Sequence, residues 1–167
     1  IEGVGGTLNA TTWFDRTNYF ETVPSVDLEL ALWLESDRMG WMLPAMTQEK
    51  LDNQRDVVKN EKRQRYDNQP YGDWDERVQG LVYPETHPYH HTVIGSMEDI
   101  DGDTLDDVRS FFETFYVPNN AVLTLAGDIE PAHALEQVKR YFDEIEPGGE
   151  IPPLPGNPEI DPIIGST

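Results

Sequence analysis

The sequence contains no cysteine and few basic residues, and each shortage excludes a class of function. Without cysteine the chain can form no disulfide, no cysteine-ligated zinc site and no cysteine nucleophile. Its 12 Lys and Arg stand against 32 Asp and Glu, which gives a formal net charge of −20. So acidic a chain is a poor partner for nucleic acid or for an anionic membrane surface.

Long apolar runs are also missing, since no stretch approaches the roughly 20 residues that a membrane span requires. The 167 residues, 37% of them hydrophobic and 26% charged, are typical of one globular domain with a core. The chain starts at Ile1 without a Met or a signal peptide. We interpret this start as a processed or truncated end.

The residue pattern predicts an α+β fold, an antiparallel sheet with helices packed on one face. Runs of β-branched and aromatic residues predict strands over 7–13 and 18–23, joined as a hairpin by a short link. The apolar run 121–126 predicts a third, buried strand. Helical periodicity and capping residues predict helices after Pro24, Thr47 and Asp73, after Thr104, and from Pro131 onward.

Two of these helices lead to sharper expectations. The first should begin at Ser25 as N-cap, end near Gly40 and be the most buried, because residues 28–34 are apolar nearly all round. The second should be capped by Thr47 and run to about Asp67.

Glu61 is the unusual residue of the second helix, because it shares a face with the apolar residues Leu51 and Val58. A carboxylate on a core-facing stripe must be paired, protonated or bound to a metal. The simplest partner is Arg65, one turn later on the same helix. On these residues alone, an ion pair is favoured over a metal ligand.

Histidines form a second candidate site, in the loop that contains His87, His90 and His91. Neither His-Glu-x-x-His nor His-x-x-Glu-His is present, and a loop with Pro88 offers no preorganised third ligand. We favour packing and backbone hydrogen bonds over metal binding for these rings. The acids at 99, 101 and 103 resemble a calcium loop, but Thr104 and Ser110 stand where that loop needs Gly and Glu.

From Pro147 the chain changes character, because proline and glycine recur through to Pro162. We predict a folded domain over residues 1–146 and an extended linker over 147–167.

Four stretches together resemble the pitrilysin/insulinase family of zinc peptidases, the M16 group or inverzincins. They keep the family's order and spacing across about residues 1–146. They are residues 5–11, residues 55–61, residues 87–89 with 94–95, and residues 115–120 with 125–128.

The resemblance implies a zinc site to which this chain brings one ligand. Glu61 matches the glutamate that joins two histidines of a His-x-x-Glu-His helix around the metal, a helix that would lie upstream of Ile1. Gln54 stands where the family commonly has a second glutamate supporting the site, so this chain lacks a negative charge there. Asn9, Ala10 and Thr11 match the strand with which the family pairs an extended peptide substrate.

The implied function is therefore part of a zinc-dependent endopeptidase that hydrolyses peptides or unfolded segments, with Zn²⁺ as cofactor and a second M16-like half as partner. We expect the isolated chain to be inactive. The alternative is a non-catalytic M16-like subunit that serves as a binding or assembly module, which Gln54 favours and Glu61 disfavours. The usual location of members of the family, together with the lack of cysteine, favours a periplasmic or secreted bacterial protein.

Overall fold

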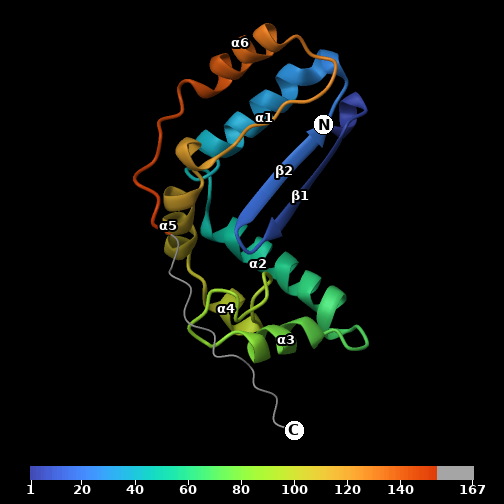
Figure 1. The fold of residues 1–167 in the computed structure, drawn as a ribbon, viewed down its shortest axis with the longest axis vertical. Helices are drawn as coiled ribbons and strands as arrows, with labels where there is room; N and C mark the ends of the chain where they lie inside the picture. Colours follow the sequence, from blue (N-terminus) through green and yellow to red (C-terminus); the bar gives the residue numbers. More distant parts are fainter. Residues whose placement is uncertain (154–167) are drawn as a thin grey trace. The chain divides into compact units, whose positions relative to one another are not determined.

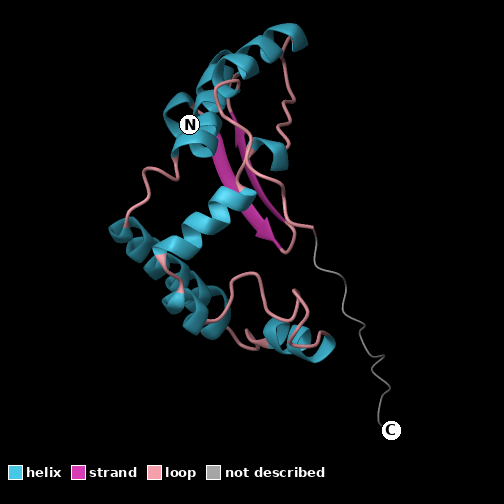
Figure 2. Cartoon of the chain, turned by 90° about the vertical axis from the view of Figure 1, so that its left-hand side faces the viewer, coloured by secondary structure: helices cyan, strands magenta, loops and turns pink. Residues whose placement is uncertain are grey.

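The computed structural model describes residues 1–153, which fall into two compact units (Figure 1). The first unit contains residues 1–46 and 105–151, and the second is built around residues 47–104. Most of the predicted linker, residues 154–167, lies outside the described residues. The division at residue 146 remains a prediction. Within the described residues, helices accompany one small antiparallel sheet (Figure 2), which is an α+β architecture.

The hairpin of the first unit forms where the sequence predicts it. Strand β1 (Thr7–Trp13) pairs antiparallel with β2 (Arg16–Thr22), in a register that runs from Thr7↔Thr22 to Trp13↔Arg16. The side chains of Leu8, Trp13 and Phe20 are exposed. Within the described residues the hairpin therefore covers no core of its own, although its strands carry large apolar side chains.

The predicted third strand is wrong. Residues 121–126 form no ladder, and Val122 is 93% exposed. A strand exists only where a neighbouring backbone accepts and donates its hydrogen bonds. In the part of the chain that the structure describes, the only ladder joins β1 to β2. The apolar composition of this run decides neither pairing nor burial.

Helix packing supplies the core of the first unit. A 3-10 turn, η2 (Ser25–Asp27), leads into α1 (Leu28–Trp41), and α6 (Pro131–Phe142) lies alongside α1 (Figure 1). Leu32 of α1 and Ala134 of α6 are buried. Trp33 and Trp41 stay about half exposed, so α1 is buried along one face and not all round, as its composition had suggested.

Two local predictions for α1 fail for identifiable reasons. Ser25 makes no side-chain cap, because it lies inside the 3-10 turn that precedes the helix. Gly40 does not end α1 but lies within its last turn. A Cβ on Gly40 would come within 3.2 Å of the Ile145 side chain, so glycine here permits a close contact and not a stop.

The remaining elements of the first unit are two short turns and a helix rich in aromatic residues. They are the 3-10 turns η1 (Glu2–Val4) and η4 (Pro118–Asn120), and the helix α5 (Leu105–Phe115). Rings of Phe111, Phe112 and Tyr116 pack on one another at the end of α5. Asn119 accepts a hydrogen bond from the Gly148 amide and donates one to the Gly149 carbonyl, which fixes the start of the proline-rich segment.

The second unit is helical. It contains α2 (Gln48–Lys62), a π-helical turn η3 (Arg63–Asp67), α3 (Trp74–Val82) and α4 (Met97–Gly102). Thr47 caps α2 as predicted, its Oγ1 accepting from the Lys50 amide at 3.3 Å. Ser96 caps α4, a helix that was not predicted from the sequence. None of the helices in residues 1–153 is long and apolar enough to cross a membrane.

Substitution of Leu32 tests whether this side chain belongs to the core. Leu32 is 2% exposed, so Leu32→Ala should lower the free energy of unfolding by about 2–5 kcal/mol. The matched control is Leu135→Ala on α6, because Leu135 is 55% exposed and its loss should cost less than about 1 kcal/mol. Urea denaturation measures both, and equal losses would contradict the assignment of the core.

Candidate functional site

Glu61 lies near the end of α2 and is more exposed than the sequence predicts. Its side chain is 41% exposed, and its Oε1 lies 3.0 Å from Nη1 of Arg65. The predicted ion pair is thus present, but the expected burial is not. Val57, one turn earlier on the same side, is about half exposed as well. This face of α2 is therefore open within its unit.

Gln54 belongs to the same open face. It is exposed, and it precedes Glu61 by two helical turns. At about 100° per residue, Glu61 points about 120° away from Arg55, which occupies a different side of the helix. Helix α2 thus has one face that carries the candidate ligand and another that holds the helix in place.

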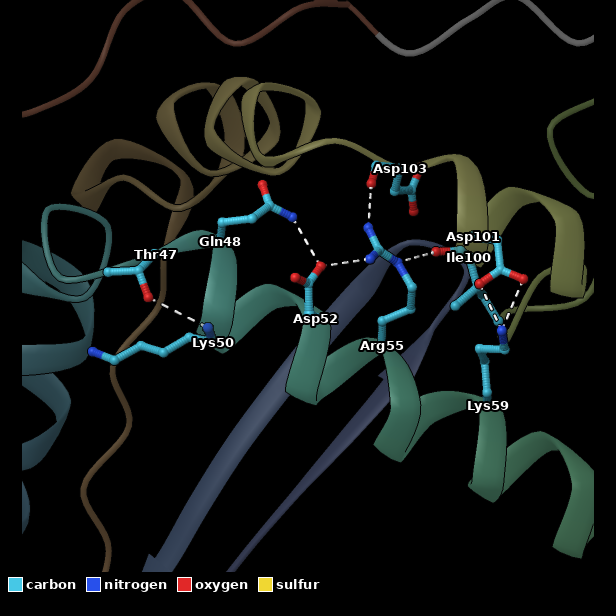
Figure 3. A network of polar contacts seen from close by, with 9 residues as sticks. All are labelled: Thr47, Gln48, Lys50, Asp52, Arg55, Lys59, Ile100, Asp101 and Asp103. Carbon is cyan, nitrogen blue, oxygen red and sulfur yellow. Dashed lines mark hydrogen bonds and ion pairs between the residues drawn. The ribbon is translucent and has the colours of Figure 1, made fainter.

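The holding face of α2 is a polar clamp centred on Arg55 (Figure 3). The Arg55 guanidinium donates to the carbonyls of Ile100 and Asp103 at 2.8 and 2.7 Å, and to Asp52 Oδ1 at 2.7 Å. Lys59 Nζ, one turn further along α2, contacts both carboxylate oxygens of Asp101 at 2.6 and 2.8 Å.

The clamp places two cations at the carboxyl end of α4. The last carbonyls of a helix lack partners within it and carry partial negative charge. Arg55 satisfies two carbonyls at this point, and its side chain is only 18% exposed. Two of the three hydrogen bonds run from α2 to the end of α4 and hold the two helices together, whereas the third, to Asp52, lies within α2 and orients the guanidinium.

A second contact fixes the far end of α2. Lys62 is buried, and its Nζ lies 3.5 Å from Oε2 of Glu76 on α3 and 5.8 Å from the centre of the Tyr66 ring. A buried ammonium needs such partners, because its desolvation is costly. Glu61 directly precedes Lys62 in the sequence. The contacts that anchor Lys62 therefore also fix the backbone position from which the Glu61 side chain extends.

The histidine loop is held by packing and backbone hydrogen bonds, as predicted. His87 is buried, its Nδ1 accepts from the Tyr89 amide at 3.0 Å, and its ring stacks on Tyr83. Nδ1 of His90 lies 2.8 Å from the Tyr83 carbonyl, and Nδ1 of His91 lies 3.2 Å from the Thr92 carbonyl.

Residues 1–153 contain no cluster of three or more His, Asp or Glu side chains that could hold a metal ion. This includes the surroundings of Glu61 and the loop of His87, His90 and His91. Within the described residues Glu61 is thus a single carboxylate on an open surface. A zinc site built on it requires further ligands from outside the described residues.

The other candidate residues, Asn9, Ala10 and Thr11, lie in the middle of β1. All three are exposed, and they pair with Phe20, Tyr19 and Asn18 of β2. The Ala10 amide donates to Oδ1 of Asn9 at 2.8 Å, and Arg16 donates to Thr11 Oγ1 at 3.0 Å. These residues belong to the first unit, whereas Glu61 belongs to the second.

Comparison with known proteins places these features in a family. Residues 104–165 match the family model described as "Peptidase M16 inactive domain". The zinc protease PqqE of Helicobacter pylori is 34% identical over 87% of this chain, and an uncharacterized zinc protease of Mycobacterium leprae is 30% identical over 85%. The chain belongs to the M16 peptidase family.

Solved structures agree with this membership of the M16 family. A protease from Helicobacter pylori superposes with a TM-score of 0.83 at 33% identity, covering 93% of this chain and 37% of that one. The ferredoxin protease FusC, crystallised as a mutant in complex with Arabidopsis ferredoxin, gives 0.73 at 29% identity, covering 88% of this chain and 16% of that one.

This M16 chain spans about a third of its curated relatives, 32% of the Helicobacter protein and 31% of the Mycobacterium protein. The relatives are named zinc proteases, so zinc belongs to the family. The described part of this chain holds no complete metal-binding group.

The clamp that orients Glu61 was not predicted from the sequence. Asp52 and Arg55 at spacing i, i+3 were a visible signal of pairing. The partners that matter, however, are carbonyls more than 40 residues away, on a helix that was not predicted.

Loss of the clamp should loosen α4. Arg55→Ala should destabilise residues 97–102 by about 1–3 kcal/mol, because it leaves two carbonyls unsatisfied and removes a charge-assisted hydrogen bond. Arg77→Ala is the control, since its ion pair with Asp73 is exposed and its loss should leave the protection of α4 nearly unchanged. Amide hydrogen exchange of α4 measures the difference, and equal protection in the two variants would refute the clamp.

Proposed function

We propose that this chain forms part of a zinc-dependent M16 endopeptidase, to which it contributes Glu61 as a metal ligand and β1 as a substrate-pairing strand. The observation that carries the proposal is the presentation of Glu61. Its carboxylate stands on the open face of a helix fixed by Arg55, Lys59 and Lys62. Rigid support with an accessible carboxylate is what a metal ligand requires.

The chemistry of Glu61 suits zinc, because carboxylate oxygens are ordinary zinc ligands in hydrolases. Bound zinc would lower the pKa of a coordinated water and polarise a peptide carbonyl. The role of Glu61 is to hold the metal, while the histidine ligands and the general base would come from residues outside this chain. Gln54 could still donate a hydrogen bond toward the site, without the negative charge that its family counterpart adds.

Arg65 is the present partner of Glu61 and would have to release it. An exposed i, i+4 pair contributes only about 0.3–0.5 kcal/mol, so the competition is weak. Coordination to zinc is far stronger than such a pair. The ion pair is therefore compatible with a ligand role, and it keeps the carboxylate solvated and oriented until the metal is supplied.

Strand β1 suits the second role. Asn9, Ala10 and Thr11 are exposed, and within residues 1–153 only β2 pairs with this strand. An extended peptide could add to such an edge through main-chain hydrogen bonds. The Asn9 side chain holds the Ala10 amide at 2.8 Å, so it would have to turn away if that amide joined a peptide. Unfolded protein segments are the substrates that such an edge would accept.

A non-catalytic binding module remains the second candidate. The family model that matches residues 104–165 is described as an inactive domain, which favours this alternative. The substitution of glutamine for glutamate at position 54 points the same way. In either case the chain would work with a second M16-like half or subunit, and a protein such as the ferredoxin held by FusC illustrates the kind of partner a relative binds.

Zinc binding in the longer polypeptide that contains this chain tests the role of Glu61. After equilibration with zinc and desalting, the enzyme hypothesis predicts about one zinc per chain and at least roughly a tenfold loss of affinity in Glu61→Gln. Glu49→Gln, in the first turn of the same helix, is the control and should retain the metal. Full zinc occupancy in Glu61→Gln would refute the proposed role of Glu61 as a zinc ligand.

The isolated 167-residue chain provides a second readout. We expect it to bind almost no zinc and to leave unstructured peptides intact, because Glu61 alone cannot form a closed site. Chelator-sensitive cleavage by the isolated chain would contradict this expectation. If the longer polypeptide neither bound zinc nor cleaved peptides, the binding-module alternative would replace the enzyme hypothesis.

A further inference from the structure

Tyr19 connects the hairpin to two helical segments of the first unit. It lies in the second half of β2, where half-buried residues alternate with exposed ones. The Arg38 guanidinium of α1 lies over the Tyr19 ring, 4.1 Å from the ring centre. The Tyr19 hydroxyl lies 3.1 Å from the hydroxyl of Tyr116, which directly follows α5. One side chain of the hairpin is therefore held at its ring face and at its hydroxyl.

Arg38 is itself held in place on α1. Its guanidinium donates to both carboxylate oxygens of Glu35, one turn earlier on the same helix, at 3.0 and 3.3 Å. A two-pronged pair of this kind fixes the plane of a guanidinium. The cation that lies over the Tyr19 ring is thus oriented by a second contact, and the attraction between cation and ring acts in a defined direction.

Tyr116 is held in place as well. Its ring packs on Phe112, with 4.1 Å between ring centres, and on Phe111, with 5.9 Å. The rings of Tyr116 and Tyr19 also meet edge to face. Burial and the hydrogen bond with Tyr116 raise the pKa of Tyr19, so its hydroxyl keeps its proton and the bond between the two hydroxyls persists near neutral pH.

Across the hairpin, Tyr19 stands directly opposite Ala10, the central residue of the candidate substrate strand. The two-residue link makes Trp13–Arg16 a hydrogen-bonded pair, and pair types alternate from there, so Ala10–Tyr19 is a non-hydrogen-bonded pair. The Ala10 amide agrees with this, because it donates to Oδ1 of Asn9 at 2.8 Å. In such pairs the opposing side chains are closest and the backbone groups point outward. Tyr19 thus stands behind the backbone that a peptide would join.

The hairpin needs such support, because within the described residues apolar packing does not fix it. The side chains of Leu8, Trp13 and Phe20 are exposed. An isolated two-stranded hairpin is only marginally stable in water. A mobile edge loses conformational freedom when it pairs with a peptide, and this loss weakens binding. Contacts that fix β2 in advance reduce the loss.

We propose that Tyr19 is a positioning residue for the peptide-binding edge. Through Arg38 and Tyr116 it holds β2, and through β2 it holds the Ala10 backbone ready for an extended peptide. The inference rests on the role of β1 given in the proposed function. It predicts that contacts on the covered side of the hairpin set the affinity for peptide at the open edge.

Kinetics of the zinc-loaded longer polypeptide, with a short unstructured fluorogenic peptide as substrate, test this role. Tyr19→Phe removes the bond between the hydroxyls and keeps the ring under Arg38. KM should rise about two- to fivefold while kcat stays within about twofold, because binding of substrate and transition state weakens equally. Tyr116→Phe removes the same bond from the other side and should have the same effect. The double variant should show no further rise.

Tyr141→Phe is the matched control, because it removes another hydroxyl bond of the first unit, the 2.6 Å bond to Glu29. It should keep the wild-type KM. A loss of folded protein would lower the apparent kcat and leave KM unchanged, so KM separates positioning from stability.

An unchanged KM in both Tyr19→Phe and Tyr116→Phe, or an equal rise in Tyr141→Phe, would overturn the inference and leave the proposed function in place. If Tyr19→Phe does not fold, Tyr116→Phe decides the case, because it removes the same bond. Failure of the wild-type polypeptide to cleave the peptide would instead refute the proposed enzyme function, and the positioning role with it.

Discussion

The packing of α6 against α1 is the contact on which the first unit depends, because the exposed hairpin cannot supply a core. Leu32 and Ala134 are buried where the two helices meet, and the absent side chain of Gly40 admits Ile145. Glu29 of α1 accepts hydrogen bonds from Tyr141 at 2.6 Å and from Arg140 at the edge of the same contact. Buried apolar side chains and partly exposed polar contacts are thus combined in this one pair of helices.

In the second unit, polar contacts do much of the work that apolar packing does in the first. Lys62 is its buried charged side chain, and Arg55 and Lys59 are mostly covered. Hydrogen bonds to carbonyls at a helix end are directional, whereas apolar contacts allow sliding and rotation. Such contacts fix the direction in which α2 presents its side chains, including the candidate residue Glu61. In this way the geometry of the candidate site depends on residues that never touch it.

The sequence predicted the features that depend on residues close together in the chain, and it did not predict those that depend on distant partners. The hairpin, the Thr47 cap and the start of α6 at Pro131 follow from residues within a few positions, and all three are confirmed. Residues 121–126 have the composition of a strand, but pairing needs a neighbour that composition cannot reveal. The exposure of Glu61 was missed for the same reason, because a stripe on a helix does not show whether anything covers it.

The division of the chain into units also has a kinetic consequence. Residues 47–104 are contiguous, so the second unit closes through contacts of short sequence separation, which form quickly. The first unit joins residues 1–46 to residues 105–151, and α1 meets α6 only after the whole intervening segment has been made. During synthesis Leu32 and the rest of the packing face of α1 therefore stay uncovered until α6 has been made. The last helix of the described residues to leave the ribosome is therefore the one that completes the first unit.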